Sequence, residues 1–319
     1  MLKEILATLQ VLSLPTRTNF RSITKREIAL FKGPNGWGEF SPFLEYEKEE
    51  SAYWLASGIE AAFGELPKPL RSEIQINATL PAVDSKLDIE KILSWYPGAT
   101  VVKIKIGEDL TADINRIENT LAVNPNLKIR LDVNGSWSVK QAETAVDQII
   151  SRIGIEKLEY IEQPVSTLEE LRQLQLPVPV VGDEVIRKAK DPFDIDLNGA
   201  IDILMLKVAP LGGINRAINI AAHHKLPVVV SSALESAVGI SHGIKLAASV
   251  PQLNFACGLA TGKLLANDVA ELPINDGRMK VETVIPSGML NFQASPERDR
   301  KSTRLNSSHV ALSRMPSSA

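Results

Sequence analysis

The sequence has little cysteine, with Cys257 the only one among 319 residues. A single thiol cannot close a disulfide within the chain, and it cannot supply a zinc site made of several cysteines. We expect Cys257 to be a small buried side chain and not a nucleophile. The lack of a disulfide framework agrees with a reducing compartment, and we predict a cytoplasmic protein.

Long apolar runs and a strong excess of charge are also lacking. No apolar stretch is long enough to span a bilayer, and the N-terminus has no cationic segment followed by an apolar core, as a signal peptide would. The formal net charge is -3, with no long basic run. We therefore predict neither membrane nor nucleic acid as a partner. The composition, 44% hydrophobic and 23% charged, is that of a soluble globular protein, either a monomer or a homo-oligomer.

Histidine is scarce, with four in the chain, and no HExxH motif or equivalent occurs. His223 and His224 fall late in a helical stretch and are expected at the surface, while His242 is expected to be structural. No glycine-rich phosphate loop follows the first strand of the repeating region described below. The sequence thus offers neither a histidine-based metal motif nor a phosphate loop.

Residues 1–73 are predicted to form a small α+β domain. Lys25–Lys32 has the composition of a strand, and a glycine-rich turn leads from it into Trp37–Phe40, a pattern typical of a β-hairpin. Glu47–Phe63 carries apolar residues at helical spacing. Strands followed by a helix indicate an α+β unit.

Residues 74–266 show a different pattern, in which short apolar runs alternate with amphipathic helical stretches. The runs recur at a spacing of roughly 20–30 residues, as in βα units that build a parallel sheet. Eight units in roughly 200 residues favour a (β/α)8 barrel of the TIM type over an open doubly wound sheet. The predicted strands are Ile74–Leu80, Val101–Ile106, Lys128–Val133, Lys157–Ile161, Val178–Gly182, Asp202–Val208, Pro227–Ser231 and Leu253–Cys257, and helices are predicted at Val139–Ile150, Leu168–Leu174 and Ile214–His223.

The C-terminal part falls into two segments. Residues 267–298 leave the barrel pattern, and their Pro/Gly-punctuated portion, Leu272–Leu290, is predicted to return to the N-terminal domain. Residues 299–319 have no apolar periodicity, and Asp299–His309 resembles one reading frame of a common sequencing adapter. We therefore treat residues 299–319 as a non-native tail and exclude them from fold reasoning.

The strand at Val101–Gly107 is the element around which the predicted site is organised. Side chains alternate across a strand, so Lys103 and Lys105 point to one face and the apolar residues between them to the other. The apolar face is expected to lie under a helix, which places both lysines inside the barrel. Two inward ammonium groups are costly unless anions lie opposite them.

Three carboxylates can supply that negative charge. Asp132, Glu162 and Asp183 each end one of three successive apolar runs, and catalytic groups of barrels lie at the C-terminal ends of strands. Hard oxygen ligands without His or Cys select Mg²⁺ or Mn²⁺. One strand-end carboxylate alone is more often a helix cap or a solvated loop residue, but the ordered set favours a metal site. Glu159 and Glu184 adjoin the set, and alternation turns them away from it.

Lys207 ends the next apolar run, so the predicted order around the barrel is Lys103/Lys105, Asp132, Glu162, Asp183, Lys207. The lysines can then flank a metal ion that lies between them. This arrangement suits proton abstraction next to a carboxylate, in which the metal stabilises the enediolate and a lysine of depressed pKa removes the proton. The predicted partner is therefore a small-molecule carboxylate substrate.

With these residues assembled, the sequence resembles the enolase superfamily and, within it, the o-succinylbenzoate synthase family. The similarity covers residues from about Leu14 to Leu272. Its motifs are short, but together, in order and at barrel spacing, they are a strong match, and the last two favour the synthases over their relatives. The matching segments are Gly36–Phe43, Lys103–Lys105, Arg130–Gly135, Tyr160–Pro164, Gly182–Glu184, Leu206–Gly213 and Val230–Gly239.

The resemblance implies a syn dehydration of 2-succinyl-6-hydroxy-2,4-cyclohexadiene-1-carboxylate to 2-succinylbenzoate, a step of menaquinone or phylloquinone synthesis. Lys105 would remove the α-proton and return it to the departing hydroxyl. The three carboxylates would bind Mg²⁺, with Mn²⁺ as the alternative. Lys207 would lie across the ring as a cation, and Lys103 would help to depress the pKa of Lys105.

The resemblance also implies roles around the site. Arg130, on the same strand face as Asp132, would support substrate binding, and Ser231 and Ser232 would receive the succinyl carboxylate. The N-terminal domain would cap the barrel, with Leu14–Phe20 as a mobile loop over the substrate. Muconate cycloisomerases, dipeptide epimerases and N-acylamino acid racemases share the lysines and metal ligands and stay open as alternatives. A metal-binding barrel without catalysis would have no use for paired lysines.

Overall fold

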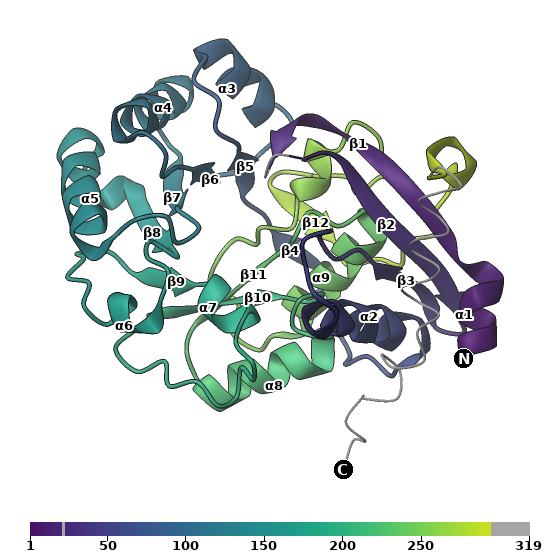
Figure 1. Ribbon diagram of the computed structural model, residues 1–319. Helices are drawn as coiled ribbons and strands as arrows, with labels where there is room; N and C mark the ends of the chain where they lie inside the picture. Colours follow the sequence, from purple (N-terminus) through teal and green to yellow (C-terminus); the bar gives the residue numbers. More distant parts are fainter. Residues whose placement is uncertain (21–22, 295–319) are drawn as a thin grey trace.

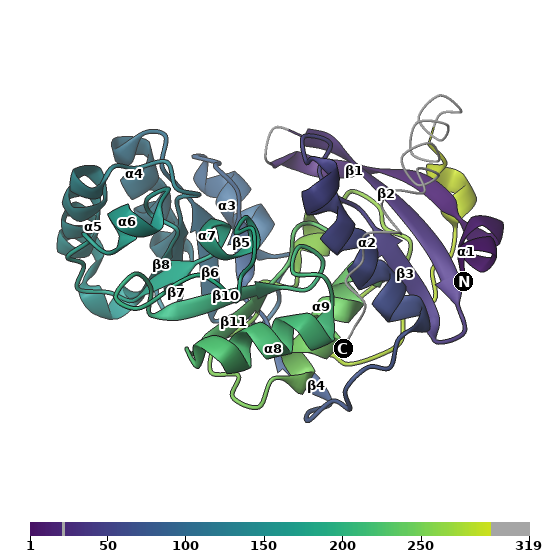
Figure 2. The same ribbon diagram turned by 60° about the horizontal axis from the view of Figure 1, so that its bottom comes forward.

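The structure, a computed structural model, describes residues 1–20 and 23–294. The described chain forms an N-terminal sheet with a helix packed on it and, beside this, a larger barrel of parallel strands with helices outside (Figures 1 and 2). The predicted α/β architecture, a TIM-like barrel with an N-terminal α+β cap, is therefore confirmed. The predicted tail, residues 299–319, lies outside the described residues.

The cap is an antiparallel sheet in the order β1-β2-β3, on which helix α2 packs. The predicted hairpin is confirmed, since Lys25–Lys32 lies within β2 and Trp37–Phe40 within β3. The helix lies so close to β3 that a Cβ at Gly38 would collide with the carbonyl oxygen of Gly58 in α2. Glycine, which has no Cβ, permits this approach. The elements are α1 (Leu2–Thr8), β1 (Gln10–Phe20), β2 (Ile23–Gly33), β3 (Gly36–Phe40) and α2 (Lys48–Phe63).

The mobile loop expected at Leu14–Phe20 is instead part of strand β1, so that prediction is wrong. The segment pairs with β2 in antiparallel register, with a shift between Pro15 and Phe20. Leu12 and Leu14 project to the same face and are fully buried, which is the period of a strand. Strand pairing therefore runs through the residues that were expected to cover the substrate as a loop.

The barrel is a parallel sheet in the order β11-β10-β9-β8-β7-β6-β5. It closes through two residues that bridge the outer strands without forming a regular strand. Asn77, just before β5, donates its backbone N–H to the carbonyl of Cys257 (3.0 Å), and Gly258 donates to Val230 of β11 (2.9 Å). Residues 257 and 258 thus occupy the eighth position of the predicted barrel.

Three predicted strands differ in extent from the observed ones. Ile74–Leu80 contains two strands, of which β4 lies outside the barrel sheet and β5 inside it. Val178–Gly182 keeps only its last three residues as β9, because the adjacent Pro179 has no N–H to donate. Leu253–Cys257 pairs through its last residue only. The strands are β4 (Glu73–Gln75), β5 (Ala78–Leu80), β6 (Val101–Lys105), β7 (Lys128–Asp132), β8 (Leu158–Glu162), β9 (Val180–Gly182), β10 (Ile203–Lys207) and β11 (Val228–Ser231).

The barrel strands are buried on both faces, as parallel strands under helices are expected to be. One face contributes to the layer under the helices, which includes Val102, Ile104 and Leu131. The other face fills the interior with a separate cluster, made of Tyr160, Val181, Ile203, Met205 and Val229. The inward side chains that follow this cluster along the strands are the lysines and carboxylates of the predicted site.

Five of the helices outside the barrel, α3, α4, α5, α6 and α9, begin at side-chain caps. In α5, Ser138 and Gln141 form a capping box, and in α6, Thr167 and Glu170 do the same. The predicted helix at Leu168–Leu174 is shorter than expected and ends at Leu171. The helices are α3 (Lys86–Leu93), α4 (Leu110–Val123), α5 (Val139–Ile153), α6 (Leu168–Leu171), α7 (Glu184–Arg187), α8 (Ile214–His224) and α9 (Ala237–Ser249), with 3-10 helices η1 (Ile155–Lys157) and η2 (Thr261–Leu264).

The last described segment contacts both the barrel and the cap. Strand β12 (Arg278–Lys280) pairs antiparallel with β4. The 3-10 helix η3 (Met289–Phe292) then packs on β1, and Ala294 donates a backbone hydrogen bond to Val11 (3.0 Å). The segment thus pairs with β4 before it reaches the N-terminal sheet.

Cap and barrel share one apolar cluster. Leu12, Leu14 and Ile28 of the cap sheet pack with Leu234 and Val238 of the barrel. All five side chains are buried, and each fully buried side chain of this kind contributes about 1.5–3 kcal/mol. This cluster fixes the cap over the C-terminal ends of the last barrel strands, where the candidate site lies.

Candidate active site

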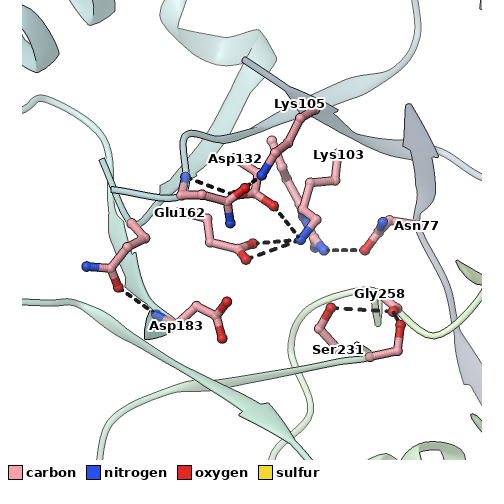
Figure 3. Close-up of polar contacts among 12 residues, drawn as sticks. Asn77, Lys103, Lys105, Asp132, Glu162, Asp183, Ser231 and Gly258 are labelled. Atoms are coloured by element: carbon pink, nitrogen blue, oxygen red, sulfur yellow. Dashed lines mark hydrogen bonds and ion pairs between the residues drawn. The ribbon is translucent and has the colours of Figure 1, made fainter. Parts of the chain in front are cut away.

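The register of the barrel strands brings the predicted site residues together. Lys105 of β6 is the pairing partner of Asp132 in β7, and Asp132 is the partner of Glu162 in β8. Asp183 follows β9, and Lys207 is the last residue of β10. Since parallel strands end at the same edge of the sheet, these side chains gather at the C-terminal end of the barrel, as Figure 3 shows for Lys105, Asp132, Glu162 and Asp183.

Lysine ammonium groups lie among the carboxylates. The Nζ atom of Lys103 is 3.1 Å from Oδ2 of Asp132 and 3.0 Å from Oε2 of Glu162, between the two side chains (Figure 3). Lys105 lies 3.4 Å from Oδ1 of Asp132, and its side chain is 29% exposed, so it faces the open pocket. The inward direction predicted for both lysines is therefore observed.

Burial and these ion pairs shift the titration of the cluster. Burial alone would lower the pKa of Lys103, but Asp132 and Glu162 outweigh it and hold that pKa well above its usual range. Burial favours the neutral form of Asp132 as well, yet Lys103 and Lys105 hold its pKa well below its usual value. Burial and the neighbouring Asp132 charge raise the pKa of Glu162 to about 7. Of the three carboxylates, Glu162 is thus the one whose ionised form most needs an added positive charge nearby.

The other end of the cluster is built around Asp183. Lys207 donates to its Oδ2 atom at 2.5 Å, and the guanidinium of Arg187 lies 3.3 Å from its Oδ1 atom. Although burial opposes it, the charges of these two cations hold the pKa of Asp183 well below its usual value. Tyr46 of the cap accepts a hydrogen bond from Arg187 (2.9 Å), so the cap reaches the back of this carboxylate.

Two amide side chains that the sequence interpretation missed fix the carboxylates. Gln163 has a left-handed backbone (φ 40°), and its Oε1 atom accepts the backbone N–H of Asp183 at 3.0 Å. Asn134, also left-handed (φ 50°), donates from Nδ2 to Glu184 at 3.1 Å. Both residues lie in segments on which the family resemblance rests. The sequence therefore pointed to these positions, but no function was predicted for their side chains.

The pocket wall opposite the carboxylates is lined by hydroxyl groups (Figure 3). Ser231 and Ser232, which were predicted to bind substrate, both line it, and both donate to the carbonyl of Gly258. Thr261 lies 2.6 Å from the Ser232 hydroxyl. The buried hydroxyl of Thr79 also lines the pocket and has no hydrogen-bond partner among the described residues. The Thr79 hydroxyl can therefore donate to an anionic or carbonyl group, whereas the two serine hydroxyls would first have to turn from Gly258.

Two of the predicted site residues do not line the pocket. Glu162 is fully buried, and both of its carboxylate oxygens accept from Lys103. Arg130 lies on the face predicted for it, but deeper in the barrel, where its guanidinium stacks 4.6 Å from the centre of the Tyr160 ring. It also donates to Asn77 (3.0 Å). Arg130 therefore supports the floor of the site and does not contact the pocket space.

The alternation of side chains along a strand predicted the wrong direction for the side chains of both glutamates that adjoin the carboxylate set. Glu184 lines the pocket because β9 ends at Gly182 and a helix begins at Glu184, so the strand period no longer applies. Glu159 lies at a register shift between β7 and β8, and its carboxylate turns inward to Arg130 at 2.5 Å. Glu159 pairs with the buried arginine and stays outside the pocket lining.

The donor set fits a hard divalent cation, since Asp132, Glu162 and Asp183 offer oxygen atoms and no nitrogen or sulfur. Across residues 1–20 and 23–294, no three acidic, histidine or cysteine side chains surround a common point as they stand. The carboxylate oxygens are instead bonded to Lys103 and Lys207. A bound cation would compete with these two ammonium groups for the carboxylate oxygens.

The fold and site together define the class. The family model described as "Enolase N-terminal domain-like" matches residues 11–62, and "Enolase C-terminal domain-like" matches residues 90–288. The chain belongs to the enolase superfamily, whose enzymes generally use Mg²⁺.

Curated relatives narrow the assignment. An o-succinylbenzoate synthase of Mycobacterium ulcerans is 46% identical over 306 residues, which is 93% of this chain and 91% of that protein. Its counterpart in Mycolicibacterium smegmatis is 45% identical over 94% of each chain. Within the superfamily, the chain therefore belongs to the o-succinylbenzoate synthase family.

Solved structures agree with the fold. The muconate lactonizing enzyme of Pseudomonas putida has a TM-score of 0.70 at 20% identity, and the comparison covers 92% of this chain and 97% of that one. The Pseudomonas fluorescens enzyme complexed with muconolactone has a TM-score of 0.71 at 19% identity, with the same coverage. At this identity the likeness concerns the fold alone. Among the described residues, no helix has the length and apolar character needed to cross a membrane.

Proposed function

We propose that this protein is a hydro-lyase that converts 2-succinyl-6-hydroxy-2,4-cyclohexadiene-1-carboxylate into 2-succinylbenzoate and water. The observation that carries the proposal is the pocket in which Lys105 and Lys207 stand on either side of the strand-end carboxylates. Relatives named o-succinylbenzoate synthase, 44–46% identical over most of the chain, support it.

Lys105 is the proposed catalytic base. Of the three lysines at the site, it is paired over the longest distance, 3.4 Å to Asp132. In its neutral form it takes the proton from the ring carbon that bears the carboxylate, and the C–H electron pair becomes the new ring double bond. It then returns that proton to the departing hydroxyl, which leaves as water. One lysine on one face of the ring therefore serves both steps of a syn elimination.

The proposed metal is Mg²⁺, with Mn²⁺ as the alternative, and the proposed ligands are Asp132, Glu162 and Asp183. When bound, the cation neutralises the negative charge that develops on the substrate carboxylate. The raised pKa of Glu162, caused by burial and by the Asp132 charge, supports a need for positive charge here. Lys103 then remains close to the base and keeps the local potential positive.

The remaining pocket residues bind the substrate. Lys207 is proposed to lie across the ring as a cation that stabilises the developing charge. Ser231 and Ser232 are proposed to receive the succinyl carboxylate, because their hydroxyl groups lie on the wall opposite the carboxylate cluster. Arg130 is proposed to support this site from below through its contact with Tyr160. We further propose a role in menaquinone or phylloquinone synthesis in the cytoplasm, which the single cysteine supports.

One observation favours a second activity. Lys207, like Lys105, ends a barrel strand and lines the pocket, so a lysine is available at each side of a bound substrate. Two such lysines could exchange the α-proton of an N-acylamino acid, as a racemase requires. We keep racemisation as the alternative activity of the same site.

The decisive experiment supplies the cyclohexadiene carboxylate to purified protein and follows absorbance of the aromatic product. We expect turnover with Mg²⁺, loss of turnover after exhaustive chelation with EDTA, and recovery when Mg²⁺ is returned. Lys105→Ala should be inactive, while Lys140→Ala, at an exposed site on α5, should match the parent. Full activity after chelation would exclude the metal, and no product from the metal-loaded parent would exclude the synthase reaction.

A further inference from the structure

The loop between β11 and α9 forms one wall of the pocket. Ser231, Ser232, Ala233 and Leu234 all line it. Leu234 adopts a left-handed backbone conformation (φ 63°), which is unfavourable for a residue with a bulky side chain. Such a conformation persists only where surrounding contacts hold it in place. The contacts that hold Leu234 in this conformation come largely from the cap.

The cap grips Leu234 through its backbone and its side chain. The Nε atom of Arg26, in β2, donates to the carbonyl oxygen of Leu234 at 3.0 Å. The Leu234 side chain is 1% exposed and packs with Leu12, Leu14 and Ile28 of the cap sheet. The strained residue of the pocket wall is therefore anchored in the core of the cap.

Glu39 of β3 holds the next residues of the same loop. Its carboxylate, 5% exposed, accepts the backbone N–H of Ser236 (3.1 Å), the hydroxyl of Ser236 (2.6 Å) and the backbone N–H of Gly239 (2.8 Å). The hydroxyl of Ser41 donates to it as well (2.7 Å). A Cβ at residue 239 would lie 2.9 Å from Oε2 of Glu39, so glycine there permits the approach. Four donors thus fix one buried carboxylate at the start of α9.

We infer that Glu39 is a positioning residue for the reaction, because it joins the cap to the pocket wall formed by residues 231–234. It has no contact with the pocket space and acts through Ser236 and the strained Leu234. Together with Arg26 it holds the two ends of a short segment, Leu234–Ser236, in one geometry. The placement of the Ser231 and Ser232 hydroxyl groups then depends on a side chain from the other unit of the protein.

The chain contains a matched control. Glu60, in α2 of the cap, accepts the backbone N–H of Asn215 at 3.1 Å and that of Ile214, at the start of α8. It is also a cap carboxylate at the N-terminus of a barrel helix. Among the described residues, however, none of positions 208–213 before α8 lines the pocket. Glu60 thus links cap to barrel without bordering the site.

Glutamine is an informative replacement at both positions. Whichever way the amide of Glu39→Gln turns, its NH₂ group faces the backbone N–H of Ser236 or of Gly239. The same conflict arises for Glu60→Gln with the N–H groups of Ile214 and Asn215. Both variants lose one acceptor of a buried or half-buried backbone donor, but only Glu39 holds a loop that borders the pocket.

The first measurement, hydrogen–deuterium exchange of the full-length protein, does not depend on the reaction. We expect faster exchange in peptides covering residues 231–240 for Glu39→Gln and in peptides covering 213–218 for Glu60→Gln. The second measurement is steady-state dehydration, which rests on the proposed function. We expect kcat/KM to fall about 10- to 100-fold for Glu39→Gln, the scale of a misplaced site, and to stay within about twofold for Glu60→Gln.

Ser236→Ala covers the case in which Glu39→Gln does not fold. It removes the hydroxyl that donates to Glu39 but leaves the carboxylate and its backbone donors in place. We expect a smaller loss of kcat/KM with the same faster exchange over 231–240. Equal kinetic losses in Glu39→Gln and Glu60→Gln, or unchanged exchange over 231–240, would overturn the inference. An inactive parent protein with the expected exchange pattern would refute the proposed reaction but not the positioning contact.

Discussion

Glu235 gives the structure a testable dependence of stability on pH. The side chain is 1% exposed, and one carboxylate oxygen accepts the backbone N–H of Ala233 at 2.7 Å. The other oxygen is buried and has no hydrogen-bond partner among the described residues. Burial, with a contribution from the nearby Glu39 carboxylate, raises the pKa of Glu235 from 4.5 to about 7. The folded protein therefore binds this proton more tightly than the unfolded chain.

The sign and size of the effect follow from linkage. Because the folded-state pKa is raised, the contribution of Glu235 to stability is fully present below pH 4.5 and is lost as pH rises through about 7. A pKa that moves from 4.5 to about 7 corresponds to roughly 3 kcal/mol, at about 1.4 kcal/mol per pH unit. Above pH 8 this destabilisation should no longer change.

The assay is urea unfolding of the parent and of Glu235→Gln at pH 5, 6, 7 and 8. The difference between the two proteins removes the contribution of other groups, such as Asp268, whose pKa burial also raises to about 7. We expect the unfolding free energy of the parent, relative to the variant, to fall by roughly 2.5 kcal/mol between pH 5 and pH 8, because part of the total is already lost at pH 5. Glu49→Gln, at an exposed position, controls for the loss of a charge. A difference that stays flat across this range would refute the reasoning.

Three further predictions concern the site and its floor. Lys105→Ala should lower kcat by at least about 10³-fold without changing the circular dichroism spectrum, and retention of a tenth of the activity would exclude it as the base. In Lys207→Arg the positive charge is kept, but a guanidinium cannot readily exchange a proton. The variant should therefore retain measurable dehydration and lose N-acylamino acid racemisation. Equal losses of the two activities would contradict this. Arg130→Met should destabilise the fold by about 1–3 kcal/mol in urea unfolding, because it leaves the buried Asn77 side chain and the Ala256 carbonyl without their donor. An unchanged midpoint would contradict that.

The sequence was sufficient to predict the parts of the site that depend on strand period and strand order. Lys103 and Lys105 project inward because they are two residues apart in a strand, and Asp132 and Glu162 meet because parallel strands end together. Contacts between distant segments were not predictable in this way. The hydrogen bond from Ser236 to Glu39 joins residues 197 positions apart, and no local sequence pattern predicts it.

Other misses have local physical causes. Helix α9 has almost no exposed face, so it lacks the amphipathic period by which helices such as α5 were predicted. Glu184 was misplaced because the strand period stops one residue before it, where a helix begins. The eighth strand was predicted over Leu253–Cys257, but its pairing is confined to residues 257 and 258, which are too few to show a strand period.

The pairing of η3 and Ala294 with β1 has a consequence for the order of events during synthesis. Strand β1 is synthesised before every barrel strand, whereas Ala294 is synthesised after all of them. The cap sheet thus cannot complete this edge while the barrel is still being made, although domains made first usually fold first. Until residue 294 has been added, the carbonyl of Val11 lacks a partner that the finished fold provides, so the completed cap forms only after the barrel sequence has been synthesised.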